Sequence, residues 1–156
     1  MMSNVLDIAV AIVFFNRPDT LNKVFESVRK ARPSTLFLIQ DGPRENNQED
    51  AVKVRECRSI VSGVDWPCNV TEIYRQENRG VAYNIYSGIS EAFEKVEKLV
   101  IIEDDIVIDQ DLRSFFFYFD LMIHDISSLH LYFTKEKAHL PMGLMRITER
   151  QRRLQQ

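Results

Sequence analysis

The sequence predicts a three-layer, Rossmann-like α/β fold in which helices cover both faces of a mostly parallel sheet. Short apolar runs alternate with segments of helical periodicity along residues 8–123. The first apolar run, residues 8–15, is unbroken, which is typical of a strand buried on both faces. Polar or turn-forming residues follow each apolar run, where a strand would end. Alternating strands and helices form βαβ units with right-handed crossovers, and hence a mostly parallel sheet.

The first strand is expected over residues 8–15 and is followed by Asn16. A helix is expected next, because Pro18 and Asp19 are helix start signals. Beyond them, apolar residues recur at the i, i+3, i+4, i+7 spacing that places them on one helix face. They are Leu21, Val24, Phe25 and Val28.

The same alternation then repeats along the chain. Residues 36–40 predict a second strand that ends at an Asp-Gly-Pro turn signal, and a helix is expected over residues 49–62. Residues 70–74 predict a third strand. A long helix is expected over residues 82–96, which carry apolar side chains at helical spacing. Residues 99–102 predict a fourth strand, and three consecutive acidic residues follow it.

The regular pattern weakens after residue 123. Asp111 is a candidate cap for one further helix, and residues 129–133 are compatible with a strand. Residues 135–156 carry a net charge of +4, whereas the remaining 134 residues carry −7. We therefore expect an incomplete α/β domain over residues 1–123 and a divergent basic tail over residues 124–156. Without interleaved aromatic residues, this tail does not predict nucleic-acid binding.

The composition, with 45% hydrophobic and 28% charged residues, is that of an ordinary folded protein. The longest apolar run has eight residues, far fewer than the roughly 20 that span a bilayer, so no transmembrane segment is expected. The first seven residues lack the basic stretch and apolar core of a signal peptide, which favours a cytoplasmic location. Peripheral association with a membrane stays open.

Several kinds of chemistry have no support in the sequence. No G-x-G-x-x-G follows the first strand, and neither a P-loop nor a G-x-S-x-G motif occurs. Cys57 and Cys68 are separated by ten residues without a C-x-x-C or a nearby histidine. This spacing favours two reduced thiols over a zinc or redox site.

Polar clusters follow all four expected strands. In an open α/β sheet, ligands bind outside the carboxyl ends of the strands, where helix N-termini also point their amides. The four clusters are therefore expected to meet at one edge of the sheet and form one binding crevice. They are Asn16-Arg17, Asp41-Gly42, the loop with Asn78 and Gly80, and Glu103-Asp104-Asp105.

The acidic triplet at residues 103–105 is the sharpest of these clusters. Two unit charges 4 Å apart repel by about 4 kcal/mol at an effective dielectric of 20, so three adjacent carboxylates destabilise one another. A divalent cation removes this repulsion, and carboxylate oxygens are the ligands that Mg²⁺ and Mn²⁺ prefer. The triplet therefore predicts a Mn²⁺ or Mg²⁺ site, with an ordinary solvated turn as the alternative.

Five segments of the chain carry a resemblance to a known family. They are the first strand with Asn16-Arg17-Pro18, Gln40-Asp41-Gly42-Pro43-Arg44, Arg58 with Asp65-Trp66-Pro67-Cys68, Asn78-Arg79-Gly80, and the fourth strand with its acidic triplet. In order and spacing they are similar to the nucleotide-binding half of a GT-A glycosyltransferase of the family 2 type. The triplet is spelled as in the N-acetylglucosaminyltransferase I group. The resemblance covers residues 8–123.

The resemblance implies an enzyme that transfers a sugar from a nucleotide-diphosphate donor to a hydroxyl of a saccharide or similar acceptor. The donor would be linked to UDP, GDP or dTDP. Asp41 would hydrogen-bond the base. The base pocket would include Phe15, Asn16 and Arg17. The diphosphate or ribose would face the N-terminus of the following helix and the loop residues Asn78, Arg79 and Gly80.

The same resemblance assigns roles to the acidic triplet. Glu103 and Asp104 match the ribose and sugar side of the family's DxD-like motif. Asp105, the last acid, would bind a Mn²⁺ or Mg²⁺ ion that bridges the diphosphate and stabilises it as it leaves.

The family type also implies an inverting transfer, which requires a carboxylate base for the acceptor hydroxyl. In the family this base lies with the acceptor pocket in a second half of roughly a hundred residues, whereas only 51 residues follow Asp105. No catalytic base is therefore assigned. We expect a truncated chain that lacks the acceptor half, with a non-homologous or frame-shifted tail from His124 onward.

Two other functions stay open at this point. A non-catalytic remnant would bind a nucleotide and transfer nothing. A receiver-like signalling module would also use Mg²⁺ and acidic residues at strand ends. Such modules place their acid pair after the first strand, where this chain has Asn16-Arg17.

Overall fold

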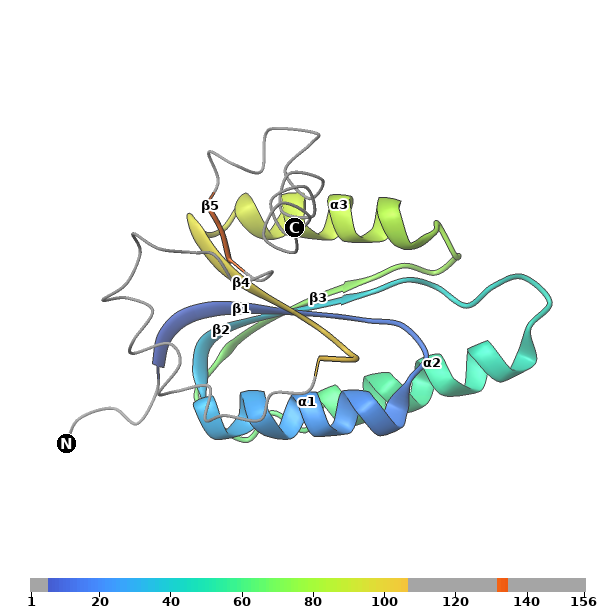
Figure 1. Cartoon of the computed structure of the whole chain (residues 1–156), viewed down its shortest axis with the longest axis horizontal. Coiled ribbons are helices and arrows are strands. Elements are labelled where there is room, and N and C mark those ends of the chain that lie inside the picture. The colour runs from blue at the N-terminus through green and yellow to red at the C-terminus, as the bar shows by residue number, and fades with distance from the viewer. Residues whose placement is uncertain (1–5, 107–131, 135–156) are drawn as a thin grey trace, which may run out of the picture.

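The computed structural model describes residues 6–106 and 132–134 (Figure 1). The strands are β1 (Leu6–Phe14), β2 (Pro33–Gln40), β3 (Asn69–Tyr74), β4 (Lys98–Glu103) and β5 (Tyr132–Thr134). The helices are α1 (Pro18–Ala31), α2 (Gln48–Val61) and α3 (Val81–Phe93). Four strands that alternate with three helices up to the acidic triplet confirm the order expected from the sequence.

The sheet has the strand order β3-β2-β1-β4-β5. The first four strands pair in parallel, and β5 pairs antiparallel with β4, which confirms a mostly parallel sheet. From β1 the chain moves outward through β2 to β3, and then adds β4 on the other side of β1. The order therefore reverses between β1 and β4, and ligands of open α/β sheets bind at such a switch point, outside the carboxyl ends of the strands.

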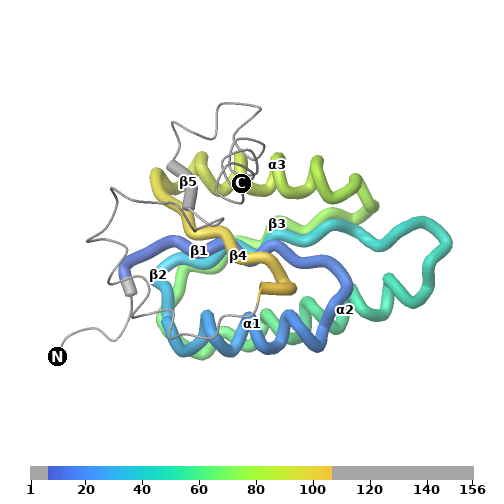
Figure 2. The backbone as a smooth tube through the Cα atoms, viewed as in Figure 1, coloured from blue at the N-terminus to red at the C-terminus, as the bar shows by residue number. Residues whose placement is uncertain are grey.

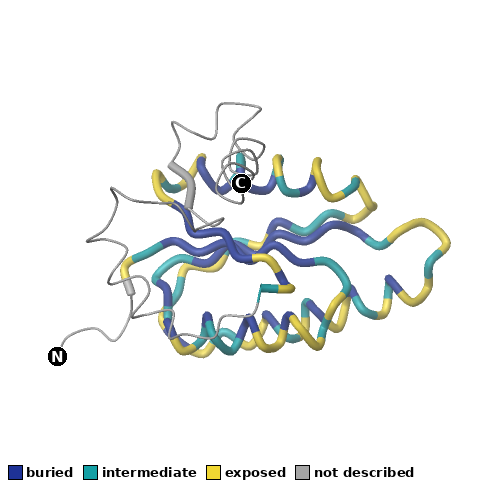
Figure 3. Tube along the Cα trace, in the orientation of Figure 1, coloured by how far each residue is buried: buried dark blue, intermediate teal, exposed yellow. Residues whose placement is uncertain are grey.

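Helices cover both faces of the sheet, as the three-layer prediction requires (Figures 1 and 2). Successive side chains of a strand point to opposite faces, and β1 divides its side chains accordingly. Val10, Ile12 and Phe14 pack in one core cluster with residues of α1 and α2. Ala9, Ala11 and Val13 pack in a second cluster with residues of α3. Between the two helix layers, β1, β2 and β4 contain the longest runs of buried residues (Figure 3).

Two strands begin earlier than their apolar runs predict. β1 begins at Leu6 and β2 at Pro33, and these two residues pair with each other across the sheet. The carbonyl of Pro33 also accepts a hydrogen bond from Trp66 Nε1 (2.9 Å). Backbone pairing of this kind leaves no apolar pattern in the sequence, so the periodicity could not show it.

α1 is terminated by Arg32, whose φ of 55° is left-handed and whose N–H donates to the carbonyl of Val28 (2.9 Å). α3 ends at Phe93, earlier than expected, and Val96 packs against the core from the following turn. None of the helices in the described part of the chain is long and apolar enough to cross a membrane.

Part of the sequence prediction lies outside the described residues. This applies to the candidate helix at Asp111, to most of the tail, and to the boundary at residue 123, which stays a prediction. Of the strand expected over residues 129–133, the last two belong to β5. In β5, Tyr132 pairs with Val100 of β4.

A close contact between α3 and β2 leads to a prediction for stability. A Cβ added at Gly88 would lie 2.4 Å from Cγ2 of Ile39, a buried side chain. We expect Gly88→Ala to lower the free energy of unfolding by about 1–3 kcal/mol, because overpacking outweighs the gain in helix propensity. Urea unfolding followed by circular dichroism measures this change.

The control for Gly88→Ala is Tyr86→Ala, at an exposed position of the same helix, which is expected to stay within about 0.5 kcal/mol of the wild type. At an exposed helical glycine the same substitution would stabilise the protein. A Gly88→Ala protein that is more stable than the wild type would therefore contradict the packing of α3 on β2.

Candidate functional site

A cavity of about 380 Å³ opens at the carboxyl ends of β1 and β4, beside the start of α3. Eight of the ten predicted donor and metal residues line it: Phe15, Asn16, Arg17, Asp41, Asn78, Glu103, Asp104 and Asp105. The other two, Arg79 and Gly80, contribute backbone hydrogen bonds at its edge. All four strand-end clusters thus meet at one site, although the role of each residue stays a prediction.

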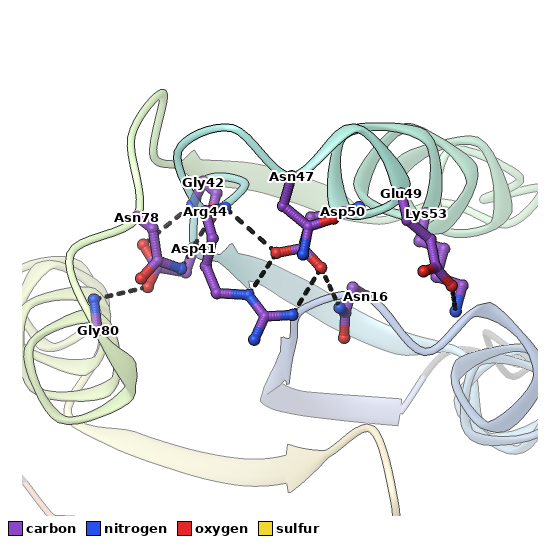
Figure 4. Close-up of polar contacts among 10 residues, drawn as sticks. All are labelled: Asn16, Asp41, Gly42, Arg44, Asn47, Glu49, Asp50, Lys53, Asn78 and Gly80. Atoms are coloured by element: carbon purple, nitrogen blue, oxygen red, sulfur yellow. Dashed lines mark hydrogen bonds and ion pairs between the residues drawn. The ribbon is translucent and has the colours of Figure 1, made fainter.

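The carboxylate of Asp41 holds the two loops of the site together. Asp41 follows β2 and is only 4% exposed. Its Oδ1 accepts hydrogen bonds from the N–H groups of Gly42 and Arg79, both at 2.9 Å, and its Oδ2 accepts one from the N–H of Gly80, also at 2.9 Å (Figure 4). A carboxylate has about four acceptor sites, so Asp41 can still accept one hydrogen bond from a ligand.

Close backbone packing reinforces this junction. Asn78 Nδ2 donates to the carbonyl of Gly42 (3.0 Å). A Cβ added at Gly42 would lie 2.5 Å from the backbone carbon of Glu77. Real Cβ atoms do not approach backbone so closely, so only glycine lets the loop after β2 and the loop before α3 pack in this way.

A second buried carboxylate, Asp50, fixes the outer wall of the cavity. It lies in the first turn of α2, is 2% exposed, and donates its N–H to the capping oxygen of Asn47 (3.0 Å). Its side chain accepts from Arg44 Nε (2.5 Å), Arg44 Nη2 (2.9 Å) and Asn16 Nδ2 (2.7 Å) (Figure 4). The hydrogen bonds from Arg44 lower the pKa of Asp50 from 3.8 to about 2.

Within the acidic triplet, Asp104 is buried whereas Asp105 is exposed. The carboxylate of Asp104, 8% exposed, accepts the N–H of Phe15 (3.1 Å), and the N–H of Asp104 donates to the carbonyl of Val13 (3.0 Å). Burial raises the pKa of Asp104, against the opposing effects of the Phe15 N–H and of Arg17. Asp105 is half-exposed and accepts a hydrogen bond from Arg17 Nη1 (2.9 Å), which also lies 3.6 Å from Asp104 Oδ1.

The backbone of Phe15 is held on both sides, which fixes the end of β1. Its N–H donates to Asp104, and its carbonyl accepts from Nε2 of the fully buried Gln40 (2.8 Å). Gln40 Oε1 in turn accepts from Arg58 Nε (2.7 Å), and the Arg58 guanidinium lies 4.6 Å from the ring centroid of Tyr74. Gln40 and Arg58 belong to the segments that carry the family resemblance, and their place in the structure is to support the cavity.

Asn84 is a cavity residue that sequence reasoning missed. It lies in α3, four residues after Gly80, and is 3% exposed. Its Oδ1 has no hydrogen-bond partner among the described residues. A buried acceptor without a partner costs about 1–3 kcal/mol, so this oxygen is suited to a hydroxyl or N–H group of a ligand. The available signal was a polar residue at a spacing that places it on the buried face of the helix.

The acidic residues at the cavity could hold a divalent ion only together with a ligand. The described part of the chain contains no group of three His, Cys, Asp or Glu side chains arranged to hold a metal. Asp104 is turned toward Phe15, which leaves the exposed carboxylates of Glu103 and Asp105 accessible at the cavity. Mg²⁺ is commonly bound by one or two carboxylates together with substrate phosphates. The donor set therefore fits an ion held jointly with a diphosphate, and does not fit one held by protein alone.

Comparison with known proteins identifies one family. The model of the family described as Glycosyl transferase family 2 matches residues 9–138, which confirms the resemblance found in the sequence. No curated protein matches the chain.

The pairing of Asp50 with Arg44 predicts a dependence of stability on pH. Since the pKa of Asp50 is lowered in the fold, its ionised form stabilises the protein above the unfolded pKa of 3.8, and this stabilisation is lost as the pH falls toward about 2. We expect Asp50→Asn to lower the free energy of unfolding by about 2 kcal/mol at pH 7. Urea unfolding at pH 7 and at pH 2 would show a smaller difference at the lower pH.

Asp7→Asn, at the opposite end of β1 and exposed, is the matched control and is expected to change stability by less than about 0.5 kcal/mol. Equal losses for Asp50→Asn at both pH values would mean that the Asp50 charge does not contribute.

Proposed function

Since the chain belongs to glycosyl transferase family 2, we propose that its cavity binds the nucleoside diphosphate sugar donor of a glycosyltransferase. The observation that supports this proposal most is the convergence of the four strand-end clusters on one cavity at the switch point of the sheet. Neutral, cationic and anionic side chains line this cavity. Such a mixture suits an elongated ligand that combines a base, a sugar and phosphates.

We assign the base to the side of the cavity that Phe15, Asn16 and Asp41 line. Asp41 retains one acceptor site after its three backbone hydrogen bonds and would accept an N–H of the base. The Phe15 ring supplies an apolar surface, and its backbone is fixed by Asp104 and Gln40. A rigid surface of this kind favours binding because little conformational freedom is lost.

The diphosphate would lie at the N-terminus of α3. The first N–H groups of an α-helix have no partner within the helix and carry a partial positive charge. α3 begins at Val81, which lines the cavity, after the loop of Asn78, Arg79 and Gly80. Asn84, one turn further on, would accept a hydroxyl of the ribose or of the transferred sugar through its unpartnered Oδ1.

The acidic triplet would hold the sugar and the metal. Glu103 and Asp104, which line the cavity, would face the ribose and sugar, and Asp105 would contribute its carboxylate to Mn²⁺ or Mg²⁺. The ion would supply Lewis-acid stabilisation of the departing diphosphate. Arg17, which pairs with both Asp104 and Asp105, keeps the two carboxylates from repelling each other while no ion is bound.

Transfer also requires a base for the acceptor hydroxyl, and none of the described residues is assigned this role. The alternative is a domain that binds the nucleotide without transferring sugar. Release of sugar from a UDP-, GDP- or dTDP-linked donor, above the rate without protein, distinguishes a transferase from this alternative.

Metal-dependent nucleotide binding is the direct test of the proposal. We expect UDP, GDP or dTDP to raise the melting temperature by several degrees with Mn²⁺ or Mg²⁺, since a ligand present at 100 times its Kd stabilises by about 2.7 kcal/mol. Asp105→Asn is expected to abolish the metal-dependent part of this rise, because it removes the carboxylate that we assign to the metal. Thermal unfolding followed by circular dichroism is the measurement.

Asp7→Asn again serves as the control, because Asp7 lies near the amino end of β1, away from the cavity. This variant is expected to respond as the wild type does. If no nucleoside diphosphate raises the melting temperature with either metal, the proposed function is wrong.

A further inference from the structure

We propose that Arg44 recognises the base of the nucleotide, and that Asp50 is the positioning residue that holds the Arg44 guanidinium at the cavity. This inference rests on the proposed function, since it assumes that the cavity binds a nucleotide. It goes further by naming a residue that selects the base, and by naming the chemical class of base that the site accepts.

The Arg44 guanidinium has a fixed position with free hydrogen-bond donors. Its Nε and one hydrogen of Nη2 bind Asp50 in a bidentate pair, and its backbone N–H also donates to Asp50 Oδ2 (3.3 Å). The two hydrogens of Nη1 and the second hydrogen of Nη2 have no partner within residues 6–106 and 132–134. The side chain is 59% exposed and lines the cavity, with its guanidinium carbon 5.9 Å from the ring centroid of Phe15.

The charge of Arg44 favours a base over a phosphate as its ligand. Asp50 accepts four N–H groups, three from Arg44 and one from Asn16, which fill its acceptor sites. The pair therefore carries no net charge. A guanidinium paired with a carboxylate still donates to a neutral carbonyl oxygen, whereas the neighbouring negative charge weakens its attraction for a diphosphate.

Arg44 and Asp41 together offer complementary hydrogen-bonding groups to the edge of a base. Asp41 has one acceptor site left, Arg44 offers donors, and both residues lie in the same loop after β2 and line the same cavity. An acceptor beside a donor matches a base edge in which a ring N–H lies next to a carbonyl. Uracil, thymine and guanine have this edge. Cytosine lacks the ring N–H at neutral pH, and adenine lacks both groups.

Asp50 makes this recognition possible by holding Arg44 in place before the ligand arrives. An exposed arginine side chain carries conformational entropy that binding would otherwise have to overcome. Asp50 is fixed by its burial in the first turn of α2 and by its hydrogen bond to Asn47. The geometry thus separates the two roles, because Asp50 is too buried to touch the nucleotide.

Isothermal titration with matched nucleotides tests the proposal. UDP and CDP differ only at the hydrogen-bonding edge of the base. GDP and ADP likewise differ in the hydrogen-bonding pattern of the base. Inorganic pyrophosphate has no base. With Mg²⁺ present, we expect the wild type to bind UDP or GDP at least about tenfold more tightly than its partner CDP or ADP. Arg44→Met is expected to weaken binding of the preferred nucleotide, UDP or GDP, about tenfold. The Kd values for CDP or ADP and for pyrophosphate are expected to stay within about twofold of those of the wild type.

Two further variants keep the test decisive. Asp50→Asn is expected to reduce the ratio of Kd values between the paired nucleotides without changing pyrophosphate binding, which a merely structural role would not produce. Arg44→Lys keeps a charge but loses the bidentate pair, and is expected to lose the same selectivity if Arg44→Met does not fold. Arg29→Met is the matched control. Arg29 belongs to α1 and forms a bidentate pair with Asp65 outside the cavity.

The outcomes separate this inference from the proposed function. If the wild type binds none of these nucleotides and does not bind dTDP either, the proposed function is wrong and the inference is overturned with it. If the wild type binds UDP or GDP and Arg44→Met binds it equally well, the proposed function stands and only the inference is overturned. An equal loss for nucleotide and pyrophosphate also overturns it, because Arg44 would then bind phosphate.

Discussion

The buried carboxylate of Asp41 is the interaction on which the rest of the site depends. By accepting three backbone N–H groups, it ties the end of β2 to the loop that precedes α3. Backbone donors buried at such a junction cost free energy when they have no partner, so the loop has this conformation only while Asp41 is in place. The start of α3, with its helix N-terminus and Asn84, is thereby brought to the cavity formed by β1 and β4.

A second constraint joins the two strands of the switch point. Phe15 follows β1 and is hydrogen-bonded through its N–H to Asp104 and through its carbonyl to Gln40. This arrangement explains why three adjacent acids can coexist after β4. Asp104 is occupied by the backbone of Phe15, and Arg17 compensates the charge of Asp105. The carboxylate of Asp105 is therefore exposed and paired with Arg17, whereas that of Asp104 holds the end of β1.

The periodicity of the sequence predicted the strands, the helices and the layers, because burial of an apolar face leaves a periodic pattern. The rule that ligands bind at strand ends then brought eight predicted residues to one cavity. The partners of charged residues could not be predicted in this way. That Asp50 holds Arg44 depends on how α2 is placed against β2, and that Asn84 lacks a partner depends on packing. The start of β2 at Pro33 depends on backbone pairing alone, which leaves no side-chain pattern.

The central claim is that the loop held by Asp41 and the acidic turn after β4 bind one nucleoside diphosphate between them. Amide chemical shifts of the ¹⁵N-labelled chain, followed during titration with UDP, GDP and dTDP in the presence of Mg²⁺, test this most directly. The account predicts that one nucleotide shifts the amide signals of Arg79, Gly80, Phe15 and Asp105 together, and leaves those at the amino ends of the strands, such as Asp7, in place. Shifts at only one of the two loops, or at neither, would contradict it.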